Sequence, residues 1–155
     1  MRYLSLLLVA AAVTTGCVRT SRNPATGKID VDVESPTKTG EDWKTDLHST
    51  STIAGIGGTA RADVAEGKTN ARITVTGLQP GAVHPWHVHE GNCGSGGKIV
   101  GDPSAYTPLT VGSDGTAQSS TVLGVRLEEA AGYHVNVHLS PSQMETIIAC
   151  GNLKD

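Results

Sequence analysis

Residues 84–93 read His-Pro-Trp-His-Val-His-Glu-Gly-Asn-Cys and hold three of the six histidines of the chain. Side chains alternate across a β-strand, so His87 and His89 share one face while Trp86 and Val88 share the other. The Trp-Val face suits a hydrophobic core. The two imidazoles lie about 6.5 Å apart along the strand and can converge on one metal ion. This stretch therefore predicts a strand with its apolar face turned inward and its histidine face turned outward.

Two histidines fill only half of a four-coordinate metal site, and closely spaced histidines can also be plain surface residues. A metal site therefore needs a third ligand. Residues 133–138, Tyr-His-Val-Asn-Val-His, alternate in the same way and put His134 and His138 on a polar face. About 13 Å of extended strand separates these two, so one of them, not both, is the candidate unless the strand bends. Neutral imidazoles suit copper or zinc.

The region from residue 47 to residue 155 carries the signals of a single all-β domain. Short alternating runs such as residues 60–64 and 72–76 are separated by glycine-rich turns. Helical periodicity is nearly absent, and the best helix candidate, residues 125–131, can equally be a loop. Phe is absent, so Ile, Val, Leu and Ala must fill the core. This composition favours a sheet-on-sheet sandwich.

Residues 1–16 predict an export signal. Arg2 precedes an apolar run that is too short to span a bilayer, and the segment ends in Gly16-Cys17, as in a bacterial lipobox. We expect cleavage before Cys17, lipidation of that cysteine, and anchoring in the bacterial cell envelope at the outer membrane, facing the periplasm. The alternative is an ordinary signal peptide with an incidental cysteine.

Residues 17–46 are polar, contain two prolines and predict a flexible tether. The net charge of the chain is −3, which gives no reason to expect nucleic acid as a partner. With Cys17 acylated, Cys93 and Cys150 remain, and two thiols in an oxidising compartment normally pair. Such a bond would constrain the unfolded chain by roughly 4 kcal/mol. The alternative is that either cysteine binds copper or stays free.

Two motifs resemble the Cu/Zn superoxide dismutase family. Residues 77–90, Gly-Leu-Gln-Pro-Gly-Ala-Val-His-Pro-Trp-His-Val-His-Glu, are similar to the family's Gly-Leu-x-Pro-Gly and His-Gly-Phe-His-Val-His-Glu, and residues 149–151 match its Ala-Cys-Gly. The resemblance covers the domain and leaves out the tether. It implies a Greek-key β-sandwich or flattened barrel, and it matches Cys93 and Cys150 to the family's disulfide.

The resemblance also implies roles for individual histidines. His87, His89 and His138 resemble copper ligands, and His84 resembles a structural histidine behind the site. His134 shares a face with His138 and is a candidate fourth ligand or substitute proton donor. Copper is the expected cofactor.

The departures from the family pattern concern zinc and substrate attraction. No histidine lies between His89 and His134, so the bridging histidine and the zinc histidines are missing and zinc is not expected. Asp102 faintly resembles the zinc aspartate, but a turn residue before Pro103 is the simpler interpretation. Ile147 stands where the family has an arginine that draws the anionic substrate to copper. Residues 133–138 and the shortened middle also resemble chordin-type domains.

Three functions follow from these observations. The first is dismutation of superoxide, a small anion, with copper alone. The second is non-catalytic copper binding for buffering or delivery, with a copper donor or acceptor protein as partner. The third is a structural chordin-like β module in which the histidines are incidental. The sequence leaves the oligomeric state open.

Overall fold

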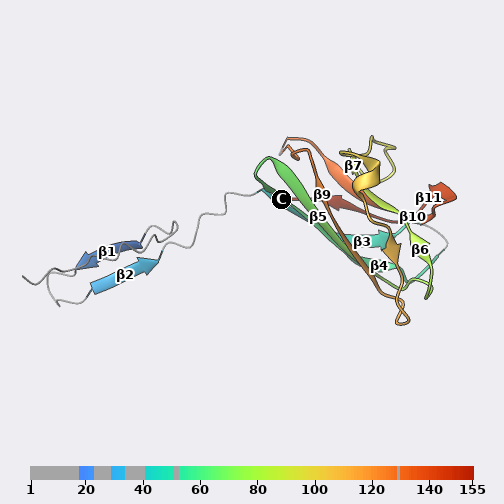
Figure 1. The fold of residues 1–155 in the computed structure, drawn as a ribbon, viewed down its shortest axis with the longest axis horizontal. Coiled ribbons are helices and arrows are strands. Elements are labelled where there is room, and N and C mark those ends of the chain that lie inside the picture. Colours follow the sequence, from blue (N-terminus) through green and yellow to red (C-terminus); the bar gives the residue numbers. More distant parts are fainter. Residues whose placement is uncertain (1–17, 23–28, 34–40, 51–52, 129) are drawn as a thin grey trace, which may run out of the picture. The chain divides into compact units, whose positions relative to one another are not determined.

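The computed structural model describes residues 18–22, 29–33, 41–50, 53–128 and 130–155 (Figure 1). The predicted export signal, residues 1–16, and the predicted lipidation site, Cys17, lie outside the described residues. The chain forms two compact units, Met1–Thr39 and Gly40–Asp155. In the first unit, strands β1 (Val18–Arg22) and β2 (Ile29–Val33) pair antiparallel. Among the described residues there is no helix of the length and apolarity needed to cross a membrane.

The second unit is all-β, which confirms the predicted class. Seven strands form one antiparallel sheet in the order β7-β10-β11-β3-β4-β5-β9, and this sheet curls into a half-barrel (Figure 1). Two further strands, β6 and β8, pair with each other, and η1 is a 3-10 turn. The elements are β3 (Asp42–Ser49), β4 (Gly57–Ala65), β5 (Lys68–Thr76), β6 (Val83–His84), β7 (Trp86–Glu90), η1 (Pro103–Ala105), β8 (Leu109–Thr110), β9 (Ala117–Leu123), β10 (Tyr133–Ser140) and β11 (Gln143–Leu153).

Strands β4 and β5 show how the sequence builds the sheet. Inward and outward residues alternate along β5, with Ala71, Ile73 and Val75 buried. Glu66 and Gly67 join the two strands with φ of 52° and 74°, the positive values that a type I′ hairpin turn requires. The register of this hairpin turns the apolar residues of both strands toward the core.

The sheet begins earlier in the chain than the polar composition suggested. Residues 42–46, which the sequence pattern assigned to the tether, form the first part of β3 and pair with β4. Trp43 and Leu47 are buried, while the residues between them are exposed or half-buried. The charged side chains that face outward made the alternation of this strand hard to recognise in the sequence.

The helix candidate at residues 125–131 is a loop over residues 125–128. Leu127 is fully buried there. The Thr69 hydroxyl donates to the Val125 carbonyl at 2.8 Å and accepts from the Leu127 N–H at 3.1 Å. One side chain of β5 therefore satisfies two backbone groups of this loop.

Candidate metal centre

Strands β7 and β10 lie side by side and bring their polar faces together. His89 is paired with His134, and His87 with Asn136, so these four side chains share one face of the sheet. The opposite face carries Trp86 and the valines of both strands, as predicted.

The histidine face is covered, which differs from the expected outward orientation. His87, His89 and His138 are 5%, 8% and 5% exposed, and His134 is fully buried. Residues 98–100 run along the edge of β7, where the Val100 N–H donates to the Val88 carbonyl. The preceding segment, residues 91–97, crosses β10, because Cys93 within it forms a disulfide with Cys150 on β11. Alternation predicts which face a side chain takes, but it does not predict that a loop covers that face.

Three of the histidines converge. One nitrogen from each of His87, His89 and His138 lies within 4.8 Å of the other two, the only such group of metal-ligating side chains among the described residues. His87 Nδ1 and His138 Nε2 are 3.2 Å apart. Nitrogens bound to one ion at about 2 Å are roughly 3 to 4 Å apart. These three histidines can therefore form a metal site with little rearrangement.

His138 lies opposite an irregular stretch of β11, which has extra residues on both sides of Ile147, the residue paired with His138. The pairing of β10 with β11 shifts register on both sides of His138, and such irregularities re-aim the side chains beside them. The His138 N–H donates to the Pro85 carbonyl at 2.8 Å. His84 Nδ1 donates to the His138 carbonyl at 3.1 Å, so His84 holds the backbone of the third histidine of the cluster. This hydrogen bond gives His84 a structural role that does not require it to bind a metal.

Hydrogen bonding fixes which nitrogen of His89 is free. Its Nδ1 donates to the Gly97 carbonyl at 2.8 Å. Its Nε2 is buried and has no hydrogen-bond partner among the described residues. Leaving such a nitrogen unpaired costs about 1–3 kcal/mol. A metal ion bound at Nε2 would remove this cost, so the donor set fits a metal that prefers imidazole.

The cluster is electrostatically suited to neutral imidazoles. Burial, followed by repulsion from the neighbouring His138 and His89, lowers the pKa of His87 to about 4. Burial also lowers the pKa of His138. Metal ions bind the neutral form of histidine, and here the fold keeps that form without needing a carboxylate.

His134 lies next to the cluster and outside it. Its ring stacks on His89 with centroids 5.3 Å apart and planes 22° apart. Neither of its nitrogens has a hydrogen-bond partner of good geometry among the described residues. Burial lowers its pKa, and the nearby Gly91 carbonyl offsets part of that effect. The sequence left the choice between His134 and His138 open, and the structure places His138 with the other two histidines.

Sequence reasoning missed Tyr106. Its ring lies edge-on to His87, with centroids 4.9 Å apart, and edge-on to Trp86 at 5.2 Å. Its hydroxyl donates to the Val100 carbonyl at 2.8 Å, and burial raises its pKa to about 12. No motif surrounds Tyr106, so the sequence carried no signal for this contact. The tyrosine restrains the His87 ring from the core side.

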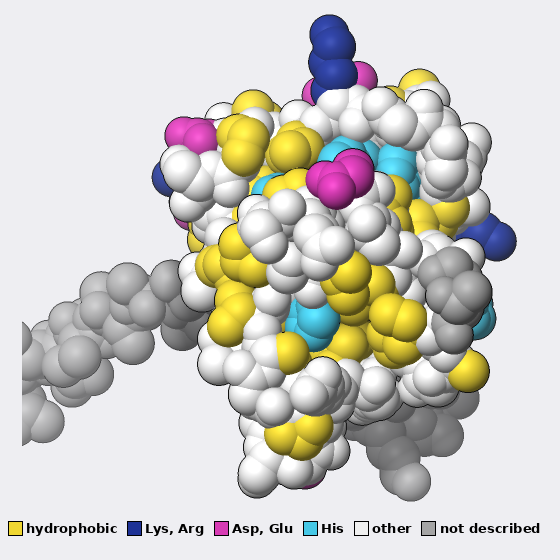
Figure 2. Space-filling view, turned by 90° about the vertical axis from the view of Figure 1, so that its right-hand side faces the viewer, with side chains coloured by type: hydrophobic (Ala, Val, Ile, Leu, Met, Phe, Trp, Pro, Cys, Tyr) yellow, Lys and Arg dark blue, Asp and Glu magenta, His cyan; other side chains and the backbone are white. Residues whose placement is uncertain are grey.

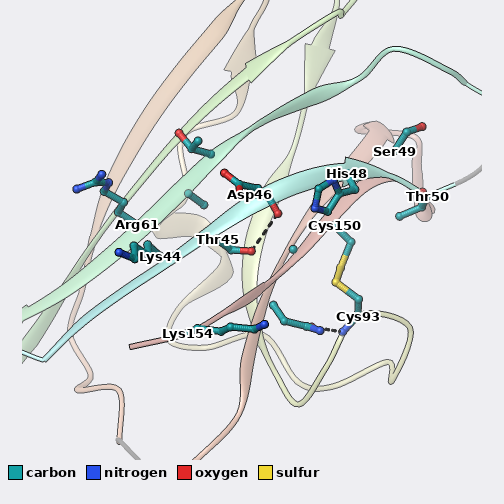
Figure 3. Close-up of a pocket in the computed structure, with 14 residues that line it drawn as sticks. Lys44, Thr45, Asp46, His48, Ser49, Thr50, Arg61, Cys93, Cys150 and Lys154 are labelled. Atoms are coloured by element: carbon teal, nitrogen blue, oxygen red, sulfur yellow. Dashed lines mark hydrogen bonds between the residues drawn. A yellow bond between two sulfur atoms is a disulfide. The ribbon is translucent and has the colours of Figure 1, made fainter.

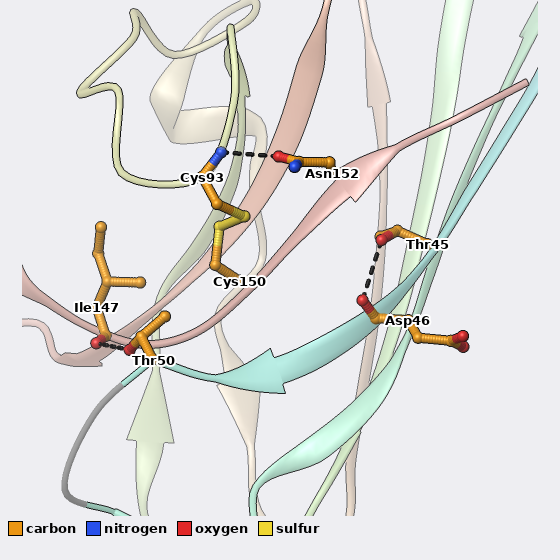
Figure 4. The surroundings of a disulfide bond; sticks show 7 residues. All are labelled: Thr45, Asp46, Thr50, Cys93, Ile147, Cys150 and Asn152. Atoms are coloured by element: carbon orange, nitrogen blue, oxygen red, sulfur yellow. Dashed lines mark hydrogen bonds between the residues drawn. A yellow bond between two sulfur atoms is a disulfide. The ribbon is translucent and has the colours of Figure 1, made fainter.

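The predicted disulfide is present between Cys93 and Cys150, with Cα atoms 6.0 Å apart (Figure 4). Asn152 on β11 accepts a hydrogen bond from the Cys93 N–H at 2.7 Å. Ile147, three residues before Cys150, accepts a hydrogen bond at its carbonyl from the Thr50 hydroxyl (Figure 4). The loop that covers the histidines is thus fixed to β11 by one covalent bond and one hydrogen bond.

Asp102 is exposed and does not belong to the histidine cluster. It caps η1, accepting from the Ser104 N–H at 2.9 Å and from the Ser104 hydroxyl at 2.8 Å. These hydrogen bonds lower its pKa. The turn interpretation of this residue is confirmed.

No protein-family model and no curated protein sequence matches the chain. The function must therefore be argued from the site. Figure 2 shows histidine side chains at the bottom of a recess that hydrophobic side chains border. Three imidazoles that are 5–8% exposed can hold a metal ion and leave it a position for a further ligand.

Proposed function

We propose that His87, His89 and His138 bind one copper ion. The observation that carries this proposal is their convergence within 4.8 Å, with His87 offering Nδ1 and the other two offering Nε2. Three neutral imidazoles suit copper, and they leave a coordination position for a further ligand. Among the described residues no second group of metal ligands accompanies them, so the proposal is for copper without zinc.

The leading activity is dismutation of superoxide. Bound copper would supply the one-electron oxidation and reduction that this reaction requires. The chain would hold the ion from three sides, and Gly97 and His84 would keep the ligand His89 and the backbone of His138 in place. The covering loop would limit access to small ligands. We propose a β-sandwich of the Cu/Zn superoxide dismutase type, and the support for it is these residues and their motifs.

His134 is the proposed fourth imidazole or the proton donor of this centre. It is fully buried beside His89, and the Gly91 carbonyl lies near its ring. A small rotation of its ring would be needed to bring a nitrogen to the ion, because the rings are now stacked.

We also propose that the protein is exported and carried on a lipid anchor at Cys17, at the outer membrane facing the periplasm. The support is the sequence of residues 1–17. Labelling with a radioactive fatty acid in a bacterial host tests it, because Cys17→Ser should abolish the label. Retention of the label in this variant would refute the anchor.

Non-catalytic copper binding is the second candidate, favoured by Ile147. This half-buried apolar residue stands where the resemblance predicts the arginine that attracts the anionic substrate. A copper buffer or a copper donor to another protein needs tight histidine ligands and no such charge. The same three histidines serve both functions.

The deciding experiment measures superoxide decay by pulse radiolysis with the copper-loaded protein, freed of loosely bound metal. Catalysed decay that is lost in His87→Ala establishes an enzyme. Copper bound at one equivalent in a histidine-dependent way, without catalysed decay, establishes a copper-binding protein. Equal copper binding by the wild type and His87→Ala would refute both.

A further inference from the structure

A cavity of about 650 Å³ lies along the junction of β3 and β11, next to the disulfide (Figure 3). Strands β3 and β11 pair at Ser49 and His48 and again at the isolated bridge between Lys44 and Lys154. Residues from the segment between these points line the cavity, together with Cys93. None of the histidines of the metal centre lines it.

Three cations line this cavity in a row. Lys44 on β3 is paired directly with Arg61 on β4 on one side and, through an isolated bridge, with Lys154 just after β11 on the other. Directly paired residues project from the same face of a sheet, and adjacent strands are about 4.8 Å apart, so the row spans about 10 Å. All three side chains are exposed. Figure 3 shows Lys44 and Arg61 next to each other on one side of the cavity and Lys154 on its lower side.

Like charges directly opposite each other destabilise a sheet, so these three cations repel one another. None of them makes an ion pair with a described carboxylate. Asp63, two residues along β4, is already bound by Arg72 and Asn70. Asp46 is the one carboxylate among the residues that line the cavity. The lining therefore carries a net charge of +2 in a chain whose net charge is −3.

We propose that this cation row is a binding site for a phosphate-type oxyanion with two or more negative charges. A single carboxylate would leave the row under-neutralised, whereas a phosphate group offers several oxygens and about two charges. The planar fork of Arg61 suits bidentate binding of such a group, and the two lysines add point charges. The anion is either a free phosphate compound or the headgroup of an anionic lipid, since both present the same chemistry.

The test uses the full chain with Cys17→Ser, so that no acyl chain contributes. Inorganic pyrophosphate is titrated by calorimetry at low salt, where surface charges are least screened. Sedimentation with phosphatidylcholine vesicles, with and without phosphatidylglycerol, forms the second arm. The test variant combines Lys44→Gln, Arg61→Gln and Lys154→Gln. The matched control, with the same net charge, combines Lys68→Gln, Lys98→Gln and Arg126→Gln at residues that do not line the cavity.

We expect the wild type and the control to bind pyrophosphate, and the cation-row variant to lose at least about tenfold in affinity. Binding of pyrophosphate without vesicle binding assigns a free phosphate compound. Binding to phosphatidylglycerol vesicles that requires the row assigns a lipid headgroup. Absence of both kinds of binding in the wild type overturns the proposal, as does equal binding by the cation-row variant.

Thermal unfolding checks that the variant has folded and provides a second readout. Removing like charges from the row should leave the melting temperature of the variant equal to or above that of the wild type. Pyrophosphate should raise the melting temperature of the wild type and the control, and leave that of the cation-row variant unchanged. If the triple variant does not fold, Arg61→Gln alone replaces it. Neither readout depends on copper, so failure of this proposal and failure of the copper proposal are distinguishable.

Discussion

Replacing Gly97 by alanine should weaken copper binding although Gly97 has no side chain at the site. A Cβ atom at this position would lie 1.8 Å from the Glu90 carbonyl oxygen and 2.7 Å from its carbon. Ordinary contact begins at 3.4 Å. The obstacle is backbone on strand β7, so the loop that carries Gly97 has to move away from the strand by about 1.5 Å.

This movement acts on the ligand His89. The Gly97 carbonyl now accepts a hydrogen bond from His89 Nδ1 at 2.8 Å. A displacement of about 1.5 Å takes the pair past the usual limit of about 3.5 Å for a hydrogen bond. Loss of such a partner of a metal-bound histidine typically costs 10- to 100-fold in metal affinity, or about 1.4–2.7 kcal/mol.

The assay is competition for copper against a chromophoric chelator of known affinity, and Gly96→Ala is the matched control. Gly96 has φ of +66°, and no heavy atom lies within 4 Å of the point that a Cβ would occupy, so alanine strains the backbone there without striking β7. The control should lose about 1–2 kcal/mol of folding stability and keep its copper affinity. Wild-type affinity in Gly97→Ala, or an equal loss in both variants, would refute this reasoning.

Three further predictions concern the disulfide, the pH dependence and His134. Cys93→Ser with Cys150→Ser should lower the free energy of unfolding in urea by about 4 kcal/mol, and a loss below about 1 kcal/mol would contradict this. In metal-free protein, His87 of the unfolded chain takes up a proton as the pH falls below 6.5, whereas His87 of the folded protein does so only near pH 4. The free energy of unfolding should therefore fall by roughly 3 kcal/mol as pH drops from 6.5 to 4. A flat profile in urea titrations would count against the buried neutral imidazole. His134→Ala should change the electron paramagnetic resonance spectrum of bound copper and Asn136→Ala should not, and an unchanged spectrum in both would exclude His134 as a ligand.

The sequence predicted the histidine cluster because two of its members follow local alternation. His87 and His89 are two residues apart on one strand, and this spacing alone places them on one face. The choice of His138 over His134 depended on how β10 pairs with β7 and β11, and its pairing with β11 is irregular around His138. Register is a property of two strands and their pairing, so the alternation within residues 133–138 could not show it.

For a related reason, the sequence could not predict that a loop covers the histidine cluster. The loop after β7 crosses the histidine face because Cys93 is bonded to β11 across the intervening strand. Pairing of the cysteines was predictable, but the strand order that turns this bond into a cover was not. The cation row was hidden in the same way, because Arg61, Lys44 and Lys154 become neighbours only through the pairing of three strands.

The disulfide loop is common to the two proposed sites, and this limits which variants can test them. Through Gly97 the loop orients His89, and through Cys93 it forms part of the wall of the cavity. Reducing the disulfide would therefore disturb both sites at once, so loss of copper or anion binding on reduction would not identify either one. Lys44 lines the cavity and His87 belongs to the histidine cluster, so substitution of each should affect one ligand only. Loss of copper binding in the cation-row variant would thus show coupling through the loop, because Lys44 has no part in holding the metal.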